Sequence, residues 1–354
     1  MNIVVVKFGG TSLATEEGRV NAVSHIASLR NEGKSVVVVV SAMGRKGDPY
    51  ATDTLLSLLN SESKKDILDL LMSCGEVISA CILADNLVRK GIDAVAITGG
   101  QAGIVTNGIF GGSDIFDIDT RRIKTELYEG KTVVVTGFQG VSVRNEVTTL
   151  GRGGSDTSAI VLAGFLKAEA VHIFTDVPGV AVIDPRVVSK AKFLEYIDMR
   201  HMYILACWGA GVIHPRAVAE AQKYDFDVFI RSTFDEGKGT RIKKNANLNL
   251  GPVGIAVMRE CGLFEPAQWD ELIIEQGKVK KAVRQSFGSG SSLLSVVFNG
   301  CGEEDMKVAL EDLPVKTQCF FSESCVHIFV ESNEIENIAN MLYNTLFENV
   351  VFTV

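Results

Sequence analysis

The sequence predicts an α/β protein whose first two-thirds form a mainly parallel sheet covered by helices on both faces. Two observations support this prediction: short β-branched runs alternate with helical stretches, and these runs are almost entirely apolar, as buried parallel strands are. Towards the C-terminus the order changes to β-α-β-β-α-β, which is a ferredoxin-like arrangement. A chain of 354 residues is long enough for two or three domains with a sizeable core.

In the first part, each expected strand is a short run rich in β-branched residues, and each expected helix has apolar residues at helical spacing. The expected strands are Ile3–Val6, Ser35–Val40, Ala94–Thr98, Thr132–Thr136, Ala170–Thr175 and Val228–Arg231. The expected helices are Gly18–Asn31, Asp53–Leu59, Lys65–Lys90, Arg121–Glu129, Thr157–Leu166, Asp198–Cys207 and Pro215–Lys223. Ligands of such sheets bind beyond the carboxyl ends of the strands, where glycine-rich loops follow in this chain.

The polar stretch Asp235–Gly251 predicts a linker or an exposed strand with its turns. After it we expect a strand at Val253–Met258 and a helix at Ala267–Gln285. The elements of the ferredoxin-like unit are then expected at Ser292–Phe298, Glu303–Leu313, Val315–Phe321, Val326–Val330, Glu334–Phe347 and Val350–Val354.

The composition restricts the classes of partner and compartment. A net charge of −8, from 35 basic and 43 acidic residues, argues against a nucleic-acid-binding protein. Seven cysteines without a C-x-x-C pair indicate reduced thiols in a cytoplasmic protein. The first residues read as a strand rather than a signal peptide, and we expect no membrane span. The five histidines have no metal-ligand spacing, so no protein-held metal site is expected.

The run T-L-G-R-G-G-S-D-T-S-A begins at Thr149, after an apolar strand and before a predicted helix. A glycine loop that leads into a helix N-terminus can bind an anion. Arg152, Ser155 and Asp156 add a clamp for a carboxylate, a hydroxyl and a charged acceptor. The alternative is a strand-to-helix turn with a helix cap, and the loop alone leaves both interpretations open.

A second glycine turn, Lys7-Phe8-Gly9-Gly10, follows the first strand. A lysine at the end of a buried strand is costly unless its charge has a partner, and the glycines allow backbone N–H groups to face an oxyanion. Together they suit a phosphate that is being transferred; the alternative is a lysine that extends to water over a simple turn. The chain has neither a Walker sequence nor G-x-G-x-x-G, which excludes a P-loop enzyme and an obvious dinucleotide binder.

Three further polar positions could contact a small substrate. Ser41 and Thr52 could hold it, although without the other motifs a turn and a helix cap are the favoured explanation of these two residues. Glu76 follows Gly75 inside a helical stretch, where a glycine costs up to about 1 kcal/mol relative to alanine. Such a glycine is tolerated where something approaches closely, so Glu76 could bind an ammonium group; the alternative is an ordinary exposed glutamate.

The segment F-T-D-V-P-G-V, which leads to D-P-R, contains Thr175, Asp176 and Arg186. A strand that ends in Thr-Asp and is followed by a turn and an arginine suits a nucleotide. The alternative is a strand-to-turn junction with ordinary turn residues.

With these motifs in order, the chain resembles the aspartokinases of the amino-acid kinase family, and among them the lysine-pathway enzymes of Gram-positive bacteria. The resemblance is close from Met1 to about Gly239. It rests on V-K-F-G-G-T-S, V-V-V-V-V-S-A-M-G-R-K-G-D-P-Y-A-T-D, S-C-G-E, T-G-G-Q-A-G, G-F-Q-G, T-L-G-R-G-G-S-D-T-S-A, F-T-D-V-P-G-V with D-P-R, and F-I-R-S-T-F. It implies a carbamate kinase-like sandwich and a C-terminal ACT module. The implied domains are a kinase domain at 1–240, a linker with a remnant ACT-like segment at 241–291 and an ACT-like module at 292–354.

The resemblance also implies an activity: phosphoryl transfer from ATP with Mg²⁺ to the side-chain carboxylate of L-aspartate, giving 4-phospho-L-aspartate. This is the first step of the diaminopimelate pathway to lysine, threonine and methionine. By this resemblance Lys7 stabilises the phosphoryl group, Gly9 and Gly10 cradle it, and Asp156 orients the cations of the site. The implied aspartate pocket consists of Ser41, Thr52, Glu76, Arg152 and Ser155, and the implied ATP contacts are Thr175, Asp176 and Arg186.

The chain departs from the family pattern in two places. Gly211 replaces a lysine that contacts the nucleotide, and Ala181 stands where the family has an aromatic residue near the adenine. One ACT module is complete, the other is reduced to Val253–Gln285, and N-G-C-G-E-E-D replaces the expected effector loop. We therefore expect an aspartokinase with weak or absent feedback control that forms a homodimer through the ACT module. The alternatives are a weakly active or inactive paralogue with a binding or regulatory role, and a kinase for another acidic substrate.

Overall fold

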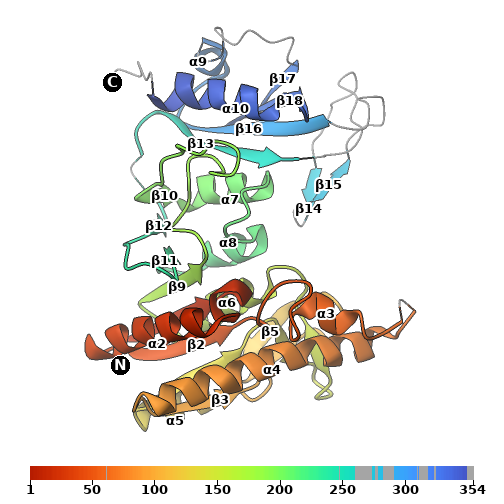
Figure 1. Ribbon diagram of the computed structural model, residues 1–354, viewed down its shortest axis with the longest axis vertical. Helices are drawn as coiled ribbons and strands as arrows, with labels where there is room; N and C mark the ends of the chain where they lie inside the picture. Colours follow the sequence, from red (N-terminus) through yellow and green to blue (C-terminus); the bar gives the residue numbers. More distant parts are fainter. Residues whose placement is uncertain are drawn as a thin grey trace. The chain divides into compact units, whose positions relative to one another are not determined.

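The computed structural model describes residues 1–60, 62–246, 248–259, 273–275, 278–281, 291–308, 310, 318–322 and 324–348 (Figure 1). The chain divides into two compact units. Unit 1 consists of Met1–Pro178 and Ala219–Arg241, and unit 2 consists of Gly179–Val218 and Ile242–Val354. The predicted boundary at residue 240 lies close to the break after Arg241. The break after Pro178 was not predicted.

Unit 1 is built on a sheet in which the strands follow the order β11-β9-β1-β2-β6-β3. All neighbours in this series pair in parallel, which confirms the predicted fold class. The bounds are β1 (Ile3–Phe8), β2 (Ser35–Val40), β3 (Ala94–Ile97), β6 (Thr132–Thr136), β9 (Ala170–Thr175) and β11 (Asp227–Ser232). The strands β2, β6 and β9 have the predicted bounds, because each is a β-branched run that ends sharply at turn residues.

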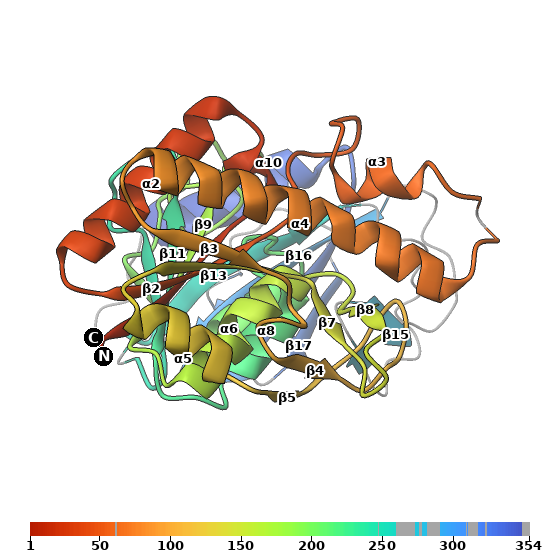
Figure 2. The same ribbon diagram turned by 90° about the horizontal axis from the view of Figure 1, so that it is seen from below.

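Helices cover both faces of this sheet (Figure 2). The helices of unit 1 are α1 (Gly10–Leu13), α2 (Glu16–Asn31), α3 (Thr52–Leu56), α4 (Lys65–Arg89), α5 (Arg121–Tyr128) and α6 (Gly154–Leu166). On one face, α2 and α4 share an apolar cluster with alternate residues of β1 and β2, such as Val6 and Val38. On the other face, α6 packs against β1, β2 and β9. Because Lys7 alternates with the α2-facing Val6 and Phe8, it points towards the α6 side.

The helix α4 has 25 residues and is long and apolar enough to cross a membrane by length and composition, contrary to the expectation from the sequence. In the structure it packs against β3, β6 and the short strand β8 (Val147–Thr149) of unit 1. It buries Leu83 and Leu87 in the apolar cluster and also buries the carboxylates of Asp69 and Glu76. This is the packing of a core helix, and the two carboxylates would be costly in lipid.

A second, smaller sheet of unit 1 has the order β5-β4-β7-β8. Its strands are β4 (Ile104–Thr106), β5 (Ile115–Ile118), β7 (Gln139–Val141) and β8 (Val147–Thr149). These strands were not predicted, because segments of three or four residues give too little periodicity to recognise. The sheet matters for function because β8 leads directly into the glycine loop at Gly151–Gly154.

Unit 2 contains an antiparallel sheet with the order β13-β16-β18-β17. Its elements are β13 (Gly251–Met258), β16 (Ser291–Asn299), α9 (Glu303–Val308), β17 (Gln318–Ser322), β18 (Cys325–Glu331), α10 (Ile335–Tyr343) and a π-helical turn at Asn344–Glu348. This order confirms the first five elements of the ferredoxin-like prediction, and Val350–Val354 lies outside the described residues. The helix α10 packs on the sheet through Leu342 and Tyr343 (Figure 1).

The predicted helix at Ala267–Gln285 is wrong. The described residues of this segment form an antiparallel pair, β14 (Ile273–Glu275) and β15 (Lys278–Lys281). The sequence contains Gly277 between these strands, and a glycine disfavours a helix interior. The remaining elements are β10 (Tyr196–Asp198), α7 (Met199–Cys207), α8 (Pro215–Ala221) and β12 (Thr240–Lys243), the last of which is a strand inside the polar stretch that follows Asp235.

Candidate active site

A cavity of about 560 Å³ lies in unit 1, where β1 and β2 end beside α4 and the start of α6. The predicted site residues that line it are Lys7, Gly10, Ser41, Thr52, Glu76, Arg152, Ser155 and Asp156. The structure therefore brings together the predicted catalytic pair and the whole predicted aspartate pocket. They meet because neighbouring parallel strands end at the same edge of the sheet, as in other open α/β sheets.

Two turns pack against each other below this cavity. The N–H of Gly44 donates to the carbonyl oxygen of Gly10 at 2.9 Å. The N–H of Ser41 donates to the carbonyl oxygen of Phe8 at 3.2 Å. A Cβ atom at Gly10 would lie 2.6 Å from the carbonyl oxygen of Ala42. Only glycine fits this approach, so the turn after β1 is kept small by its neighbour.

Lys7 and Asp156 form an ion pair of 2.7 Å from Nζ to Oδ1, and the two side chains are only 12% and 13% exposed. Asp156 lies in the first turn of α6, after Gly153, which has a left-handed φ of 71°. The structure therefore supplies the partner that a buried lysine requires, rather than letting Lys7 extend to water. A held ammonium group beside a helix start is suited to binding anionic oxygens.

Glu76 is 2% exposed, so the interpretation of an ordinary exposed glutamate is wrong. Its Oε1 accepts a hydrogen bond from the N–H of Ala42 at 3.0 Å, whereas its buried Oε2 has no hydrogen-bond partner among the described residues. Burial raises the pKa of Glu76 to about 8, because the charged form loses its hydration. A ligand that brings an ammonium group would satisfy the free oxygen and favour the ionised form.

The glycine before it also has an explanation. A Cβ atom at Gly75 would lie 2.7 Å from the Cβ of Ala42 and 2.9 Å from the carbonyl oxygen of Tyr50. The close approach predicted at this position is therefore made by the loop after β2. By admitting this loop, Gly75 lets the Ala42 N–H reach Glu76.

Arg152 and Thr52 both line the cavity. The Arg152 side chain is exposed, and within the part of the chain that the structure describes it makes no ion pair. Its guanidinium is therefore available for a carboxylate, which it can bind through two parallel hydrogen bonds. Thr52 is the first residue of α3 after the cap residue Ala51, so it is not the predicted helix cap.

The other predicted phosphate and nucleotide residues do not line this cavity. The N–H of Gly9 donates to the carbonyl oxygen of Phe174 at 3.3 Å. At the end of β9, the Thr175 hydroxyl donates to Asp176 Oδ1 at 3.1 Å, and Asp176 forms an ion pair of 2.6 Å with Arg45. Their roles in ATP binding remain predictions.

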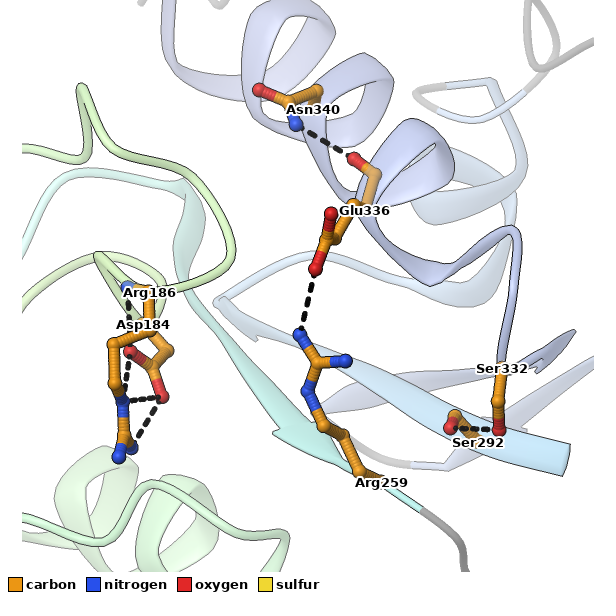
Figure 3. A network of polar contacts seen from close by, with 7 residues as sticks. All are labelled: Asp184, Arg186, Arg259, Ser292, Ser332, Glu336 and Asn340. Carbon is orange, nitrogen blue, oxygen red and sulfur yellow. Dashed lines mark hydrogen bonds and ion pairs between the residues drawn. The ribbon is translucent and has the colours of Figure 1, made fainter. Parts of the chain in front are cut away.

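Arg186 lies in unit 2 and binds Asp184, as Figure 3 shows. Its Nε and Nη2 contact the two carboxylate oxygens at 3.0 and 2.7 Å, and these hydrogen bonds hold the pKa of Asp184 below its usual value. A separate ion pair joins Arg259 to Glu336 at 3.1 Å (Figure 3). Arg186 is thus pre-oriented by Asp184, with its side chain still 89% exposed.

Gly211 also lies in unit 2, and no heavy atom would come within 4 Å of a Cβ atom added to it. Its φ is outside the left-handed region. This position, where the family resemblance implies a lysine, could therefore accept a lysine side chain without backbone strain.

Sequence reasoning missed several residues of the cavity wall, including Met72, Gly111, Phe138 and Thr149. Met72 lies one helical turn before Glu76, and this spacing could have identified it. Phe138 and Thr149 lie within the motifs G-F-Q-G and T-L-G-R-G-G-S-D-T-S-A, which supported the resemblance but gave these two residues no role. Gly111 lies in a turn whose proximity no local pattern reveals.

Comparisons with known proteins agree with this geometry. The model of the Amino acid kinase family matches residues 2–232. Aspartokinase 1 of Bacillus subtilis (strain 168) is 46% identical over 275 residues, which are 75% of this chain and 68% of the relative. Aspartokinase 2 of the same organism is 40% identical over 323 residues, which are 90% of this chain and 73% of the relative.

Solved structures show the same fold. Aspartokinase III of E. coli, in complex with aspartate and ADP, matches with a TM-score of 0.78 and 22% identity, over 98% of this chain and 100% of that chain. The family model spans well over half of the chain, and each Bacillus relative matches over more than two-thirds of its length. The chain therefore belongs to the amino acid kinase family and, within it, to the aspartokinases.

Proposed function

We propose that the chain transfers the γ-phosphoryl group of ATP to the side-chain carboxylate of L-aspartate, giving 4-phospho-L-aspartate and ADP. The observation that carries this proposal is one cavity with a buried carboxylate oxygen and a guanidinium, neither of which has a partner in the described part of the chain, and a lysine held by an aspartate. These are the complements of an ammonium group, a carboxylate and a charged phosphoryl group.

Each charged group of aspartate has a counterpart in the cavity. The free Oε2 of Glu76 accepts a hydrogen bond from the ammonium group, and the Arg152 guanidinium binds the α-carboxylate. The hydroxyls of Ser41, Thr52 and Ser155 donate the remaining hydrogen bonds. This arrangement leaves the side-chain carboxylate to face Lys7.

The chemistry requires charge stabilisation rather than a base. A side-chain carboxylate is already ionised at pH 7, so its oxygen attacks the γ-phosphorus without losing a proton. The bond from the γ-phosphorus to the bridging oxygen breaks, and ADP leaves. Lys7 and the Gly10 amide stabilise the charge on the phosphoryl oxygens, and Asp156 holds Lys7 in place.

For ATP, we propose contacts from Gly9, Thr175, Asp176 and Arg186, as the family resemblance implies. Among the described residues, no group of three or more His, Cys, Asp or Glu side chains could hold a metal ion by itself. This fits Mg²⁺ that would arrive on the ATP phosphates, with Asp156, which lines the cavity beside Lys7, as the carboxylate that would hold it there. Bound in this way, Mg²⁺ would neutralise phosphate charge.

We also propose a homodimer through the ACT-like module, a cytoplasmic location and a role in the diaminopimelate pathway. The location is supported by the cysteines: the six in the described part of the chain are all free thiols. The principal alternative is a weakly active paralogue with a regulatory role, which Gly211 favours because it brings no positive charge to the nucleotide.

The test of the proposal is ADP release from ATP and Mg²⁺ with L-aspartate compared with L-glutamate. We expect release that depends on L-aspartate and is much slower with the longer acid. Equal release with both acids would indicate another acidic substrate. No release above the rate without an acceptor, from folded protein, would support the regulatory alternative.

A further inference from the structure

Asp69 carries a buried charge that none of the roles above uses. It lies on α4, two turns before Glu76, and its side chain is 0% exposed. A buried carboxylate is costly unless other groups satisfy it. No lysine, arginine or histidine of the described chain forms an ion pair with Asp69. The charge must therefore be satisfied by hydrogen bonds alone.

Four hydrogen-bond contacts satisfy it. The N–H of Gly111 lies 3.1 Å from Oδ1 and 3.0 Å from Oδ2. The N–H of Thr149 donates to Oδ2 at 2.8 Å, and the Thr149 hydroxyl lies 2.8 Å from Oδ1. An ionised carboxylate only accepts hydrogen bonds, so it matches two backbone donors and a hydroxyl.

Both partners of Asp69 belong to the cavity wall. Gly111 and Thr149 line the cavity that holds the candidate site. The two segments that contain these residues are also joined to each other, because the N–H of Ser113 donates to the carbonyl oxygen of Thr149 at 2.8 Å. Asp69 thus fixes two chain segments to α4, and one of them, after Thr149, continues into the loop of Arg152.

Gly151 shows how closely these segments fit. A Cβ atom there would lie 3.4 Å from the carbonyl oxygen of Gly111, and its φ of 73° is left-handed. The Gly111 segment therefore lies directly against the residue that precedes Arg152. A shift of Gly111 or Thr149 would move the guanidinium relative to Glu76, which is on the same helix as Asp69.

We propose that Asp69 is a positioning residue that sets the distance between Arg152 and Glu76 and thereby the affinity for L-aspartate. The proposal rests on the proposed function of this cavity. An asparagine side chain in its place would keep the shape but turn N–H groups towards at least one of the donors, so an amide cannot replace the carboxylate here. The contrasting explanation is that Asp69 only stabilises the fold.

The test compares Asp69→Asn with the matched control Asp66→Asn, which changes an exposed carboxylate of the same helix. We expect Asp69→Asn to raise the KM for L-aspartate about ten- to a hundredfold, since small displacements of binding groups have effects of this size. The KM for ATP should stay within about twofold, and Asp66→Asn should leave both constants unchanged. An equal rise of both KM values, or no rise, would overturn the proposal.

A second variant covers the case in which Asp69→Asn does not fold. Thr149→Val removes only the hydroxyl contact, and we expect a smaller rise of the aspartate KM in the same direction; an unchanged KM would contradict the proposal. Calorimetric titration with L-aspartate separates this inference from the proposed function. If wild-type protein binds L-aspartate without turnover, the proposed reaction fails, while weaker binding by either variant still supports the positioning role.

Discussion

The two units bury ionisable groups in different ways. In unit 1, Glu76 at the cavity has one carboxylate oxygen with a hydrogen-bond partner and one buried oxygen without a partner among the residues that the structure describes. In unit 2, His327 is buried against the ring of Trp208 at 4.0 Å, and its Nδ1 is 3.0 Å from the hydroxyl of Ser295. Burial moves both groups towards their neutral forms: it raises the pKa of Glu76 to about 8 and lowers that of His327 to about 4.

The difference between them indicates which buried group serves function. The surroundings of His327 suit its neutral form, with an aromatic ring and a hydroxyl, so it needs nothing further. Glu76 keeps a buried acceptor unsatisfied, and Lys7 and Asp156 face the same cavity. Burial alone therefore does not identify a site, and neither does an unpartnered atom alone, since the Nδ1 atoms of His172 and His201 also lack a hydrogen-bond partner among the described residues. Glu76 differs because its unpartnered atom is a carboxylate oxygen on the wall of a cavity that Lys7 and Asp156 also line.

The largest effect should come from Lys7→Ala. It removes the ammonium group that faces the transferring phosphoryl group and leaves Asp156 without its partner. We expect kcat to fall about 10²- to 10³-fold, as for the loss of one charge-stabilising donor. The matched control is Lys34→Ala, which breaks an ion pair with Glu169 on the surface of unit 1 and should leave kcat near the wild-type value. Equal losses in both variants would remove Lys7 from the catalytic site.

Arg152→Ala should have the next largest effect, and only on aspartate. A guanidinium that binds a carboxylate in two places has no substitute in the cavity, and such a contact contributes about 1.5–3 kcal/mol. We therefore expect the KM for L-aspartate to rise about ten- to a hundredfold, with little change for ATP. The control is Arg121→Ala, an exposed arginine paired with Asp119. A similar rise of the KM for ATP would place Arg152 outside the aspartate pocket.

Gly211→Lys tests whether unit 2 lacks a nucleotide contact. A lysine fits this position without a clash, and a charge-assisted contact to phosphate contributes about 1.5–3 kcal/mol. We expect kcat/KM for ATP to rise about tenfold, with the KM for L-aspartate nearly unchanged. Gly211→Gln, which adds length without charge, should give little gain. If the lysine variant folds and its ATP kinetics do not change, this chain compensates elsewhere.

The smallest expected effect concerns stability and pH. The unfolded pKa of Glu76 is near 4.5 and its folded pKa is about 8, so between these values the folded chain holds a proton that the unfolded chain has lost. Its contribution to the free energy of unfolding therefore falls as the pH rises from 4.5 to 8. A glutamine does not titrate, so the Tm of Glu76→Gln should rise relative to that of the wild type as the pH increases over this range. A gap that does not change with pH would contradict the raised pKa.

His327 should give the opposite pH dependence of stability, because burial lowers its pKa instead of raising it. Its folded pKa is about 4, below the ordinary value of 6.5, so stability is lost as the pH falls from 6.5 to 4. The wild type should therefore lose stability as the pH falls from 6.5 to 4, whereas His327→Asn has no such contribution to lose. The difference in stability between the two proteins should shrink over this range and stay constant above it. Scans of both variants from pH 4 to pH 8.5 measure the two windows.

Much of the fold followed from the sequence, because it depends on local patterns. The residues of the aspartate pocket had structural alternatives when taken singly, and the family resemblance, rather than a local pattern, grouped them into one site. The β-branched runs fixed strands such as Ser35–Val40, and each glycine turn lies at the carboxyl end of its strand. The Asp69 contacts could not be predicted, since they join segments 42 and 80 residues away. A charged residue on the buried side of an apolar helix was their only local signal. The prediction of a helix at Ala267–Gln285 was wrong because the segment contains Gly277, and a glycine disfavours a helix interior.

If this cavity phosphorylates L-aspartate, the acyl phosphate product can be trapped with hydroxylamine. Purified protein with ATP, Mg²⁺ and L-aspartate should form the aspartyl hydroxamate, because an acyl phosphate reacts with hydroxylamine. Lys7→Ala protein should form about 10²- to 10³-fold less, and L-glutamate should give little product. If folded wild-type protein forms no more hydroxamate than Lys7→Ala protein, this cavity does not phosphorylate L-aspartate.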